Sequence, residues 1–430
     1  MAEAAGTKAF SLAAYATLLR TNRNFRLLWT AQVVSELGDW LYTVAIYSLL
    51  LEYTGKAQSV GIAIVLQLLP QVFIAPGAGI LNDRVSRKAV MIFADIARVF
   101  IILAMLLVTG PDRIWLVWCL LLSETVMWAL FEPGRSAVVP NICRGEEETL
   151  VANALSSTTW AINFAIGAGI GGLIAYKFGR QAVFVLNALS FVGSALLLAR
   201  MKFEEPHAAD QPPFRLKDLV DFSPVIEGIN YVRRDARLVA TLLVKAGLGM
   251  MGAHWVVLPV LGERVFPVGA GPNAGTLGMS LLMSARGIGA LIGSVGSGWW
   301  AEHRDDRLRR GITWGFVLAG LSYMGLSWAP TLAIACLAVA IGHAGTSINW
   351  VFSTTMLQRM TEDRFRGRVF SADFAGLFLS MSAISYISAY FMDRGVSVRT
   401  VAFVNGMLAF IPALLWLAAR RLWREPQSRG

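Results

Sequence analysis

Twelve apolar stretches of about twenty residues recur along the 430-residue chain, and they constrain its fold more than any other feature. A helix needs about 20 apolar residues to cross the roughly 30 Å hydrocarbon core of a bilayer. The stretches are 27–51, 57–80, 89–109, 114–134, 150–176 and 181–200, then 238–262, 274–301, 311–328, 330–353, 369–392 and 398–419. The sequence therefore predicts an all-α membrane protein with twelve transmembrane helices in two six-helix pseudo-repeats.

Polar segments divide the chain into five parts. We expect a cytoplasmic N-terminal segment at 1–26, a six-helix bundle at 27–200, a cytoplasmic central loop at 201–237, a second bundle at 238–419 and a cytoplasmic tail at 420–430. The first 24 residues lack a long apolar core followed by a small-residue cleavage site. No removable signal peptide is expected, and the first membrane helix should itself direct insertion.

The charge distribution supports a membrane protein rather than a nucleic-acid-binding one. The chain is 56% hydrophobic and 15% charged, and its net charge of +10 lies in short clusters between apolar runs, whereas nucleic-acid binding needs a solvated basic face. Segments on the side of the two termini hold 28 Lys and Arg residues, and the opposite loops hold 7. This bias predicts that both termini are cytoplasmic.

Catalytic and metal-binding patterns are missing from the sequence. Cys119, Cys143 and Cys336 are too few and too scattered for a disulfide framework or a metal site, so we expect no metal or cofactor. There is no G-x4-G-K-[ST] phosphate loop for ATP and no H-E-x-x-H zinc motif. Neither an enzyme nor a single-chain ATP-driven pump is expected.

The two halves resemble copies of each other. Gly79, Asp83 and the basic cluster after the second apolar stretch recur 219 positions later as Gly298, Glu302 and a cluster that starts at Arg304. Parallel six-helix repeats place a substrate site near the bilayer midplane, between halves that rock against each other. We therefore expect transport by alternating access.

The segment Gly79-Ile80-Leu81-Asn82-Asp83-Arg84-Val85-Ser86-Arg87-Lys88 resembles the G-x-L-a-D-R-x-G-R-K signature of the major facilitator superfamily, with Ser86 in place of the second Gly. Four more segments resemble one bacterial exporter branch: Asn24-Phe25-Arg26, Ser35-x-x-Gly38-Asp39, Phe131-x-Pro133-x-Arg135-Ser136-Ala137 and Gly367-Arg368-Val369. That branch includes siderophore exporters of the enterobactin type and macrolide efflux proteins, and its substrates vary.

The resemblance implies secondary active transport in the bacterial inner membrane, with the major facilitator fold. The expected activity is proton-coupled export of a small amphipathic or apolar molecule, such as a drug, siderophore or metabolite, by a monomer. Protons, the substrate and the lipid bilayer are the expected partners. A lipid flippase or importer of the same fold, or a non-transporting membrane sensor or scaffold, is the alternative.

A glycine-rich segment in the fifth stretch allows two interpretations. Gly167-Ala168-Gly169-Ile170-Gly171-Gly172 resembles the antiporter motif G-P-x-x-G-G, with Ala168 in place of Pro. Small residues also let two helices pack closely in lipid, whether or not the protein is an antiporter.

Carboxylates inside the apolar stretches are candidates for proton coupling or substrate binding. Glu124 is flanked by apolar residues and has no basic neighbour within a helical turn of its own stretch. It could exchange a proton or attract a cationic substrate, or it could be a structural carboxylate paired to a neighbouring helix. Asp39 and Glu36 share a helix face and should titrate as a coupled pair, unless Asp39 only stabilises a turn around Gly38.

Basic residues inside the stretches have several possible roles. Arg286 lies among small residues, where it could pair with Glu124 or Asp39, bind an anionic group or contact another helix. Asp95 and Arg98 are spaced for a local structural ion pair. Lys245 is expected to extend its ammonium toward the cytoplasmic interface.

His254 and His343 could relay protons or pack as hydrogen-bonded helix residues. Four tryptophans on the helices that line the cavity in this superfamily are candidates for an aromatic lining, or for residues at the membrane interface. They are Trp40, Trp128, Trp255 and Trp350.

A cytoplasmic gate is expected where the family motif implies that Asp83 meets the start of the eleventh stretch, near 367–371. In the second half, arginines from Arg304 onward would approach Glu146, Glu147 and Glu148. The predicted gate residues are Gly79, Asp83, Arg84, Arg87, Lys88, Glu302 and Arg368.

Overall fold

The structure is a computed structural model that describes residues 12–205, 223–271, 273–301, 304–362 and 365–423. The long helices of the first half are α3 (Arg23–Thr54), α4 (Ala57–Arg84), α5 (Arg87–Ala104), α6 (Ile114–Ile142), α7 (Glu146–Phe178) and α8 (Arg180–Ala199), preceded by the short α2 (Leu12–Thr21). Those of the second half are α10 (Ala236–Met250), α11 (His254–Arg264), α12 (Ala274–Ala301), α13 (Asp305–Ser327), α14 (Leu332–Met360), α15 (Arg366–Asp393), α16 (Val398–Leu408) and α17 (Phe410–Ala419).

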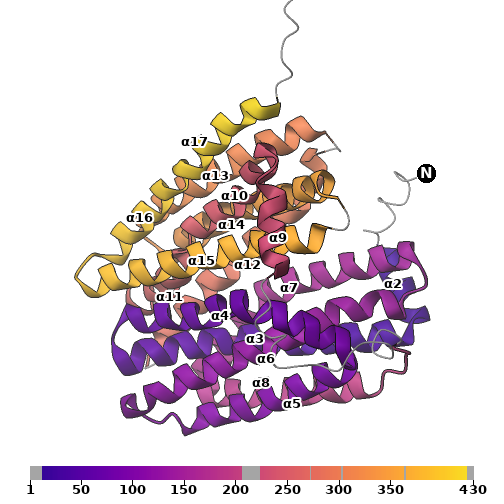
Figure 1. Ribbon diagram of the computed structural model, residues 1–430. Coiled ribbons are helices and arrows are strands. Elements are labelled where there is room, and N and C mark those ends of the chain that lie inside the picture. Colours follow the sequence, from indigo (N-terminus) through magenta and orange to yellow (C-terminus); the bar gives the residue numbers. More distant parts are fainter. Residues whose placement is uncertain (1–11, 206–222, 272, 302–303, 363–364, 424–430) are drawn as a thin grey trace, which may run out of the picture.

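These helices form two bundles that lie side by side, the first below the second in Figure 1. Each of the twelve predicted stretches is helical, and ten helical segments are long and apolar enough to cross a membrane. The other two long helices are α3, which has 32 residues and carries Glu36 and Asp39, and α13, which has 23 residues and begins with a charged turn. At 1.5 Å per residue both are also long enough to span the hydrocarbon core. The predicted all-α membrane fold is confirmed.

Three local features differ from the sequence expectation. The seventh stretch is broken at 251–253 into α10 and α11, and the predicted central loop contains a short helix, α9 (Ser223–Val232), which crosses the long helices in Figure 1. Helix α6 continues to Ile142, so the motif from Phe131 to Ala137 lies within it rather than after it, with Pro133 and Pro140 inside the helix. Membrane helices tolerate internal proline because neighbouring groups satisfy the freed backbone.

The helices alternate between two faces of the molecule. We call the face that carries α2, the loop between α4 and α5 and the end of α17 the terminal face. In Figure 1 it lies to the right in the first bundle and toward the top in the second. The other is the opposite face, where α3 joins α4 and α15 joins α16.

The two bundles meet along a seam in the half of the molecule nearer the opposite face. Helices α7 and α12 pack from a hydrogen bond of 3.2 Å between Asn273 and the carbonyl of Ala175 to a close approach of Gly287 and Ala165 near the middle of both helices. The hydrogen bonds recorded between described residues of the two bundles lie in this half.

An acidic side chain closes the seam at the opposite face. The carboxylate of Asp393, the last residue of α15, accepts hydrogen bonds of 2.8 Å from the amides of Ala57 and Gln58. These amides begin α4, where the helix dipole favours a negative charge. One turn further along, Gly61 packs against Ala389 of α15. Asp393 thus joins the two bundles through backbone groups.

Candidate functional site

An acidic cluster around one arginine lies inside the first bundle. Arg98 of α5 is 2% exposed, and its guanidinium lies 3.8 Å from Asp95 and 3.9 Å from Glu124 of α6. Asp39 of α3 is within electrostatic range of Arg98 and of both carboxylates. Asp39, predicted from the sequence, therefore lies near the ion pair of Arg98 and Glu124 without a recorded ion pair of its own among the described residues.

From the sequence, Arg98 is expected to form only a local ion pair with Asp95. The structure adds Glu124 as a second partner, from a different helix. The guanidinium also faces the rings of Phe131 and Phe191 at 5.3 and 5.0 Å, which contribute cation–π attraction. Two carboxylates thus pair with one cation in apolar surroundings, and Asp39 lies near them.

Glu36 lies one turn before Asp39 and belongs to a second polar network. It accepts hydrogen bonds from Gln32 at 2.8 Å and from Asn163 of α7 at 3.4 Å. Gln32 in turn accepts from Arg135 at 3.2 Å, and Arg135 forms an ion pair of 2.5 Å with Glu132. The Arg135 position of the exporter motif therefore ties α6 to α3 beside the acidic cluster.

Arg286 is placed apart from the acidic cluster, near the middle of the seam. Its guanidinium stacks over the ring of Trp255 at 3.7 Å and faces Phe164 of α7 at 4.8 Å. Among the described residues it forms no ion pair with Glu124 or Asp39, since Arg98 occupies that role for Glu124. The helix contact with Phe164, in contrast, is present.

The two histidines lie next to Arg286. Their rings are 4.8 Å apart, and His343 is 2.8 Å from the hydroxyl of Tyr323. The Nδ1 atom of His254 lies 2.7 Å from the carbonyl of Met251, in the break between α10 and α11. Both side chains are buried, with 5% exposure.

The prediction that Lys245 extends its ammonium toward the cytoplasmic interface is wrong. Instead of reaching toward an interface, this side chain is 1% exposed and forms an ion pair with Asp373 of α15. The ammonium also lies 4.8 to 5.3 Å from the rings of Trp350, Phe370 and Phe374. A buried carboxylate within reach outweighs the tendency to extend toward water, because an unpaired buried ammonium is costly. The feature of the sequence that indicates this pair is Asp373, an acidic residue inside an apolar stretch.

The four candidate tryptophans do not form one lining. Trp40 stacks on Phe164 with ring centroids 4.2 Å apart, and Trp255 lies on Arg286 next to the same phenylalanine. Trp350 is 40% exposed, and its ring contacts the ammonium of Lys245. Trp128 is partly buried in α6.

The glycines of the antiporter-like motif lie at close helix contacts. A Cβ atom on Gly167 would meet Trp40 at 2.6 Å, and one on Gly171 would meet the backbone of Leu41 at 2.7 Å. Gly172 faces Ser280 of α12. These positions support the packing interpretation, while an antiporter role stays a prediction.

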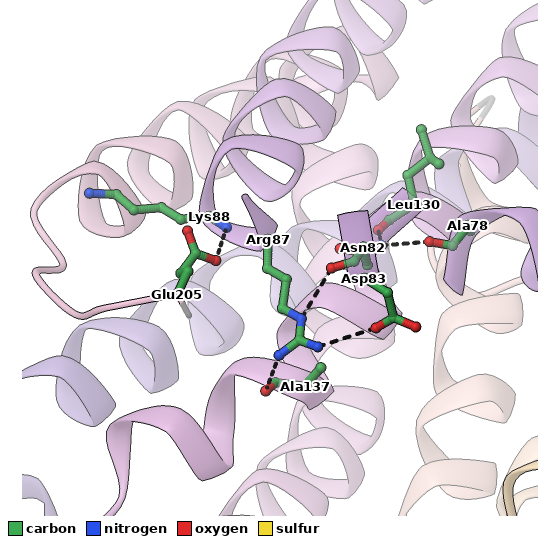
Figure 2. Close-up of polar contacts among 8 residues, drawn as sticks. All are labelled: Ala78, Asn82, Asp83, Arg87, Lys88, Leu130, Ala137 and Glu205. Atoms are coloured by element: carbon green, nitrogen blue, oxygen red, sulfur yellow. Dashed lines mark hydrogen bonds and ion pairs between the residues drawn. The ribbon is translucent and has the colours of Figure 1, made fainter. Parts of the chain in front are cut away.

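The signature segment between α4 and α5 is held to its own bundle (Figure 2). Arg87 forms an ion pair of 3.3 Å with Asp83 and donates to the carbonyls of Asn82 and Ala137 at 3.2 and 3.1 Å. Asn82 donates to the carbonyls of Ala78 and Leu130, both at 2.9 Å. The segment therefore fixes the end of α4 against α6.

Ser86, the departure from the family signature, has a structural role. Its hydroxyl caps α5 by accepting from the amide of Ala89 at 3.1 Å and donates to Glu205 at 2.5 Å. Glu205 also accepts from the amide of Lys88 at 3.3 Å, and the Lys88 ammonium donates to the carbonyls of Ala199 and Met201. Glu205, which sequence reasoning did not identify, attaches the start of the central connection to the signature segment.

The predicted gate contacts are not recorded between described residues. Asp83 is 68% exposed and pairs with Arg87, while Arg368 at the start of α15 pairs with Glu227 of α9. Gly79 and Gly367 have free space where a Cβ would stand, and Arg84 has further contacts. Glu302 lies outside the described residues. The gate therefore stays a prediction.

Comparison with known proteins is consistent with this architecture. The family described as "Transmembrane secretion effector" matches residues 13–422. Macrolide efflux protein A of Streptococcus pyogenes is 25% identical over 397 residues, which cover 91% of this chain and 94% of that protein. The putative bacilysin exporter BacE of Bacillus subtilis (strain 168) is 22% identical, covering 84% and 86%.

Solved structures confirm the fold. A bacterial homologue of the human lysosomal transporter Spinster, in an inward-facing and occupied conformation, superposes with a TM-score of 0.70 at 11% identity, covering 94% of this chain and 98% of that one. A POT family transporter in complex with 5-aminolevulinic acid gives 0.72 at 12% identity, covering 94% and 97%. The relatives are multi-pass transporters and not enzymes, as the sequence predicts. The chain belongs to the transmembrane secretion effector family of the major facilitator superfamily, among the bacterial exporters.

Proposed function

We propose that this protein is a proton-coupled secondary transporter that exports a small amphipathic molecule across the bacterial cytoplasmic membrane. It works as a monomer by alternating access, with both termini in the cytoplasm. The relatives named as macrolide and bacilysin exporters support the direction and the kind of substrate. The observation that carries the coupling is the cluster of Asp39, Asp95 and Glu124 around Arg98.

The charge balance of this cluster favours proton exchange. One guanidinium can offset one carboxylate, and each further uncompensated charge in the membrane interior costs several kcal/mol. At least one of the three carboxyl groups should therefore hold a proton, and the group that holds it can change as the bundles move.

Glu124 is the best candidate for the exchanging group. Its side chain is 14% exposed, whereas that of Asp95 is fully buried. A proton must reach solvent on one side and then on the other, which requires some access. Asp95 instead keeps Arg98 charged and in place.

The seam supports alternating access. The hydrogen bonds recorded between described residues of the two bundles lie in the half nearer the opposite face, where Asp393 bonds at the surface, and Gly287 packs against Ala165 near the middle. A conformation closed on one face is one of the two states that rocking requires. With cytoplasmic termini, this state is closed toward the outside.

Replacing Glu124 by Gln tests the coupling. Glutamine keeps the size and hydrogen bonding of the side chain but cannot exchange a proton. In inverted membrane vesicles, uptake of radiolabelled bacilysin in response to an imposed pH gradient should fall at least about tenfold, which corresponds to 1.4 kcal/mol. The matched control is Asp112→Asn, which changes a carboxylate that is 77% exposed and should transport normally. Gradient-driven uptake by Glu124→Gln at the rate of the control would remove Glu124 from the mechanism.

A further inference from the structure

Arg286 is a buried cation without a partner. Its side chain is 8% exposed, and its Nε and Nη1 atoms are inaccessible and make no hydrogen bond within the described part of the chain. No carboxylate of a described residue lies within ion-pair distance of it. An unpaired charge at this depth is destabilising by several kcal/mol, so the arrangement needs a ligand or a function that offsets the cost.

The surroundings of Arg286 offer hydrogen-bond donors and aromatic faces. Trp255 of α11 lies against the guanidinium at 3.7 Å, and its own Nε1–H is also buried without a partner. Phe164 approaches from the other bundle at 4.8 Å. Three unsatisfied donor nitrogens therefore lie together where the two bundles meet.

The neighbouring polar side chains do not neutralise this cation. The hydroxyl of Tyr323 is engaged with His343 at 2.8 Å. The Nδ1 atom of His254 is engaged with the carbonyl of Met251, and Tyr47 donates to Gln67 at 2.9 Å. The Nε2 atom of His254 is buried without a hydrogen-bond partner among the described residues, but the imidazole carries no negative charge that could offset the guanidinium, and none of these side chains is acidic.

An oxyanion fits these donors better than any other group. A guanidinium presents parallel N–H groups that match both oxygens of a carboxylate. The indole N–H of Trp255 adds a third donor, and the rings of Trp255 and Phe164 provide flat apolar surface. The break between α10 and α11 lies directly before His254 and Trp255, and discontinuous helices form substrate sites in many transporters.

We propose that Arg286 and Trp255 anchor the carboxylate of the transported molecule, which makes the substrate class amphipathic acids, including zwitterions, whose apolar body lies against Phe164. This inference rests on the proposed transport function and adds the chemical class of its substrate. Anion recognition is assigned to the second bundle and proton exchange to the first.

Binding to the full-length protein in lipid nanodiscs, without any gradient, tests this assignment. Isothermal titration calorimetry with naphthoate and its uncharged isostere naphthamide compares two probes of equal shape. The wild type should bind naphthoate at least about tenfold more tightly. Arg286→Gln should remove this preference, Arg286→Lys should keep part of it, and Trp255→Phe should weaken naphthoate binding alone.

Arg309→Gln is the matched control, because it removes a cation at the terminal face that also lies near a tryptophan, 5.8 Å from Trp423. It should keep the full preference. Arg286→Gln should unfold at a temperature no lower than that of the wild type, since it removes an unpaired buried charge. Equal binding of both probes by the wild type, an unchanged preference in Arg286→Gln, or a clear loss of its thermal stability would each overturn the proposal.

The two proposals fail in distinguishable ways. Loss of acid preference concerns binding at equilibrium, whereas loss of proton coupling concerns uptake in response to a pH gradient. A protein that binds naphthoate selectively but ignores the gradient would reject only the coupling through Glu124. One that responds to the gradient but binds both probes equally would reject only the role of Arg286.

Discussion

Charged side chains inside the bundles follow two different patterns. Lys245 and Asp373 form a closed pair among aromatic rings, with 1% and 0% exposure. Around Arg98 and at Arg286 the charges are unbalanced. Balanced pairs hold helices together, whereas unbalanced groups retain the capacity to take up a proton or a ligand. We propose that this difference separates structural from functional residues here.

Breaking the closed pair should destabilise the second bundle. Asp373→Asn leaves the Lys245 ammonium buried without its counter-charge, which should lower the free energy of unfolding by about 3–5 kcal/mol. The double variant Lys245→Met, Asp373→Leu should recover most of this loss. Chemical unfolding in detergent measures both. As a control, Arg237→Gln breaks an exposed pair with Asp235 and should change stability by less than about 1 kcal/mol. A double variant as unstable as the single one would contradict this account.

Residue roles could be predicted from the sequence only where the partner lies on the same helix. The pairing of Asp95 with Arg98 follows from their spacing. The partners of Glu124 and Lys245 lie on other helices, 26 and 128 positions away along the chain. Which residues become partners there depends on how the helices pack. Among the candidates, Arg286 could be recognised as a buried charge, but the absence of a partner among the described residues needed the structure.

At the scale of elements, the break at 251–253 is the feature that most affects the candidate site. Gly252 lies where a Cβ would meet the carbonyls of Gly249 and Met381 at 2.8 Å, and its own carbonyl accepts from Ser385 at 2.8 Å. The break turns the chain so that His254 and Trp255 start a new helix toward Arg286. The lengths of the apolar stretches predict where the helices lie. The break at 251–253 depends on the close approach of α15, and no local sequence pattern predicts that approach.

Gly252→Ala should therefore disturb both packing and binding. The added methyl group meets backbone atoms, which cannot move as a side-chain tip can, so we expect a loss of about 1–3 kcal/mol in stability and weaker naphthoate binding. Gly325→Ala places a methyl group in open space on α13 and should be neutral or stabilising by up to about 1 kcal/mol. Identical melting temperatures and affinities for the two variants would show that α15 does not constrain the break.

At the scale of the whole molecule, the two faces are held by different chemistry. At the opposite face, Asp393 binds the first amides of α4 across the seam. At the terminal face, Asp83 and Arg368 have partners within their own half or on α9. The repeat, the helix order and the fold could be predicted from the sequence, but which face is closed could not, because both states use the same helices.

Asp393→Ala should weaken the closed opposite face. Removing the carboxylate leaves two helix-terminal amides without their acceptor, a loss of about 1 kcal/mol or more, which shifts a two-state population several-fold. A cysteine placed at Gln58, in a background lacking Cys119, Cys143 and Cys336, should react faster with a membrane-impermeant maleimide. Asp112→Ala, at the same face but exposed, serves as the control. Unchanged labelling would show that the carboxylate does not hold the seam.

Asp83→Asn should shift the population of the two states in the opposite direction from Asp393→Ala. If Asp83 closes the terminal face in the second state by meeting the start of α15, its neutralisation raises the population of the state seen here. A cysteine near that face, in the same background, should then label faster from the cytoplasmic side. Equal labelling together with unaltered transport would leave the predicted gate without support.

The unpaired charge of Arg286 has an electrical consequence. Because no carboxylate of the described chain neutralises it, an acidic molecule bound there would leave the cell with its negative charge still present, while the exchanged proton enters. Two elementary charges then move inward per cycle, and each is worth about 2.3 kcal/mol at a membrane potential of 100 mV. Export of acids by this protein should therefore generate a current and continue on voltage alone, after an ionophore has removed the pH difference.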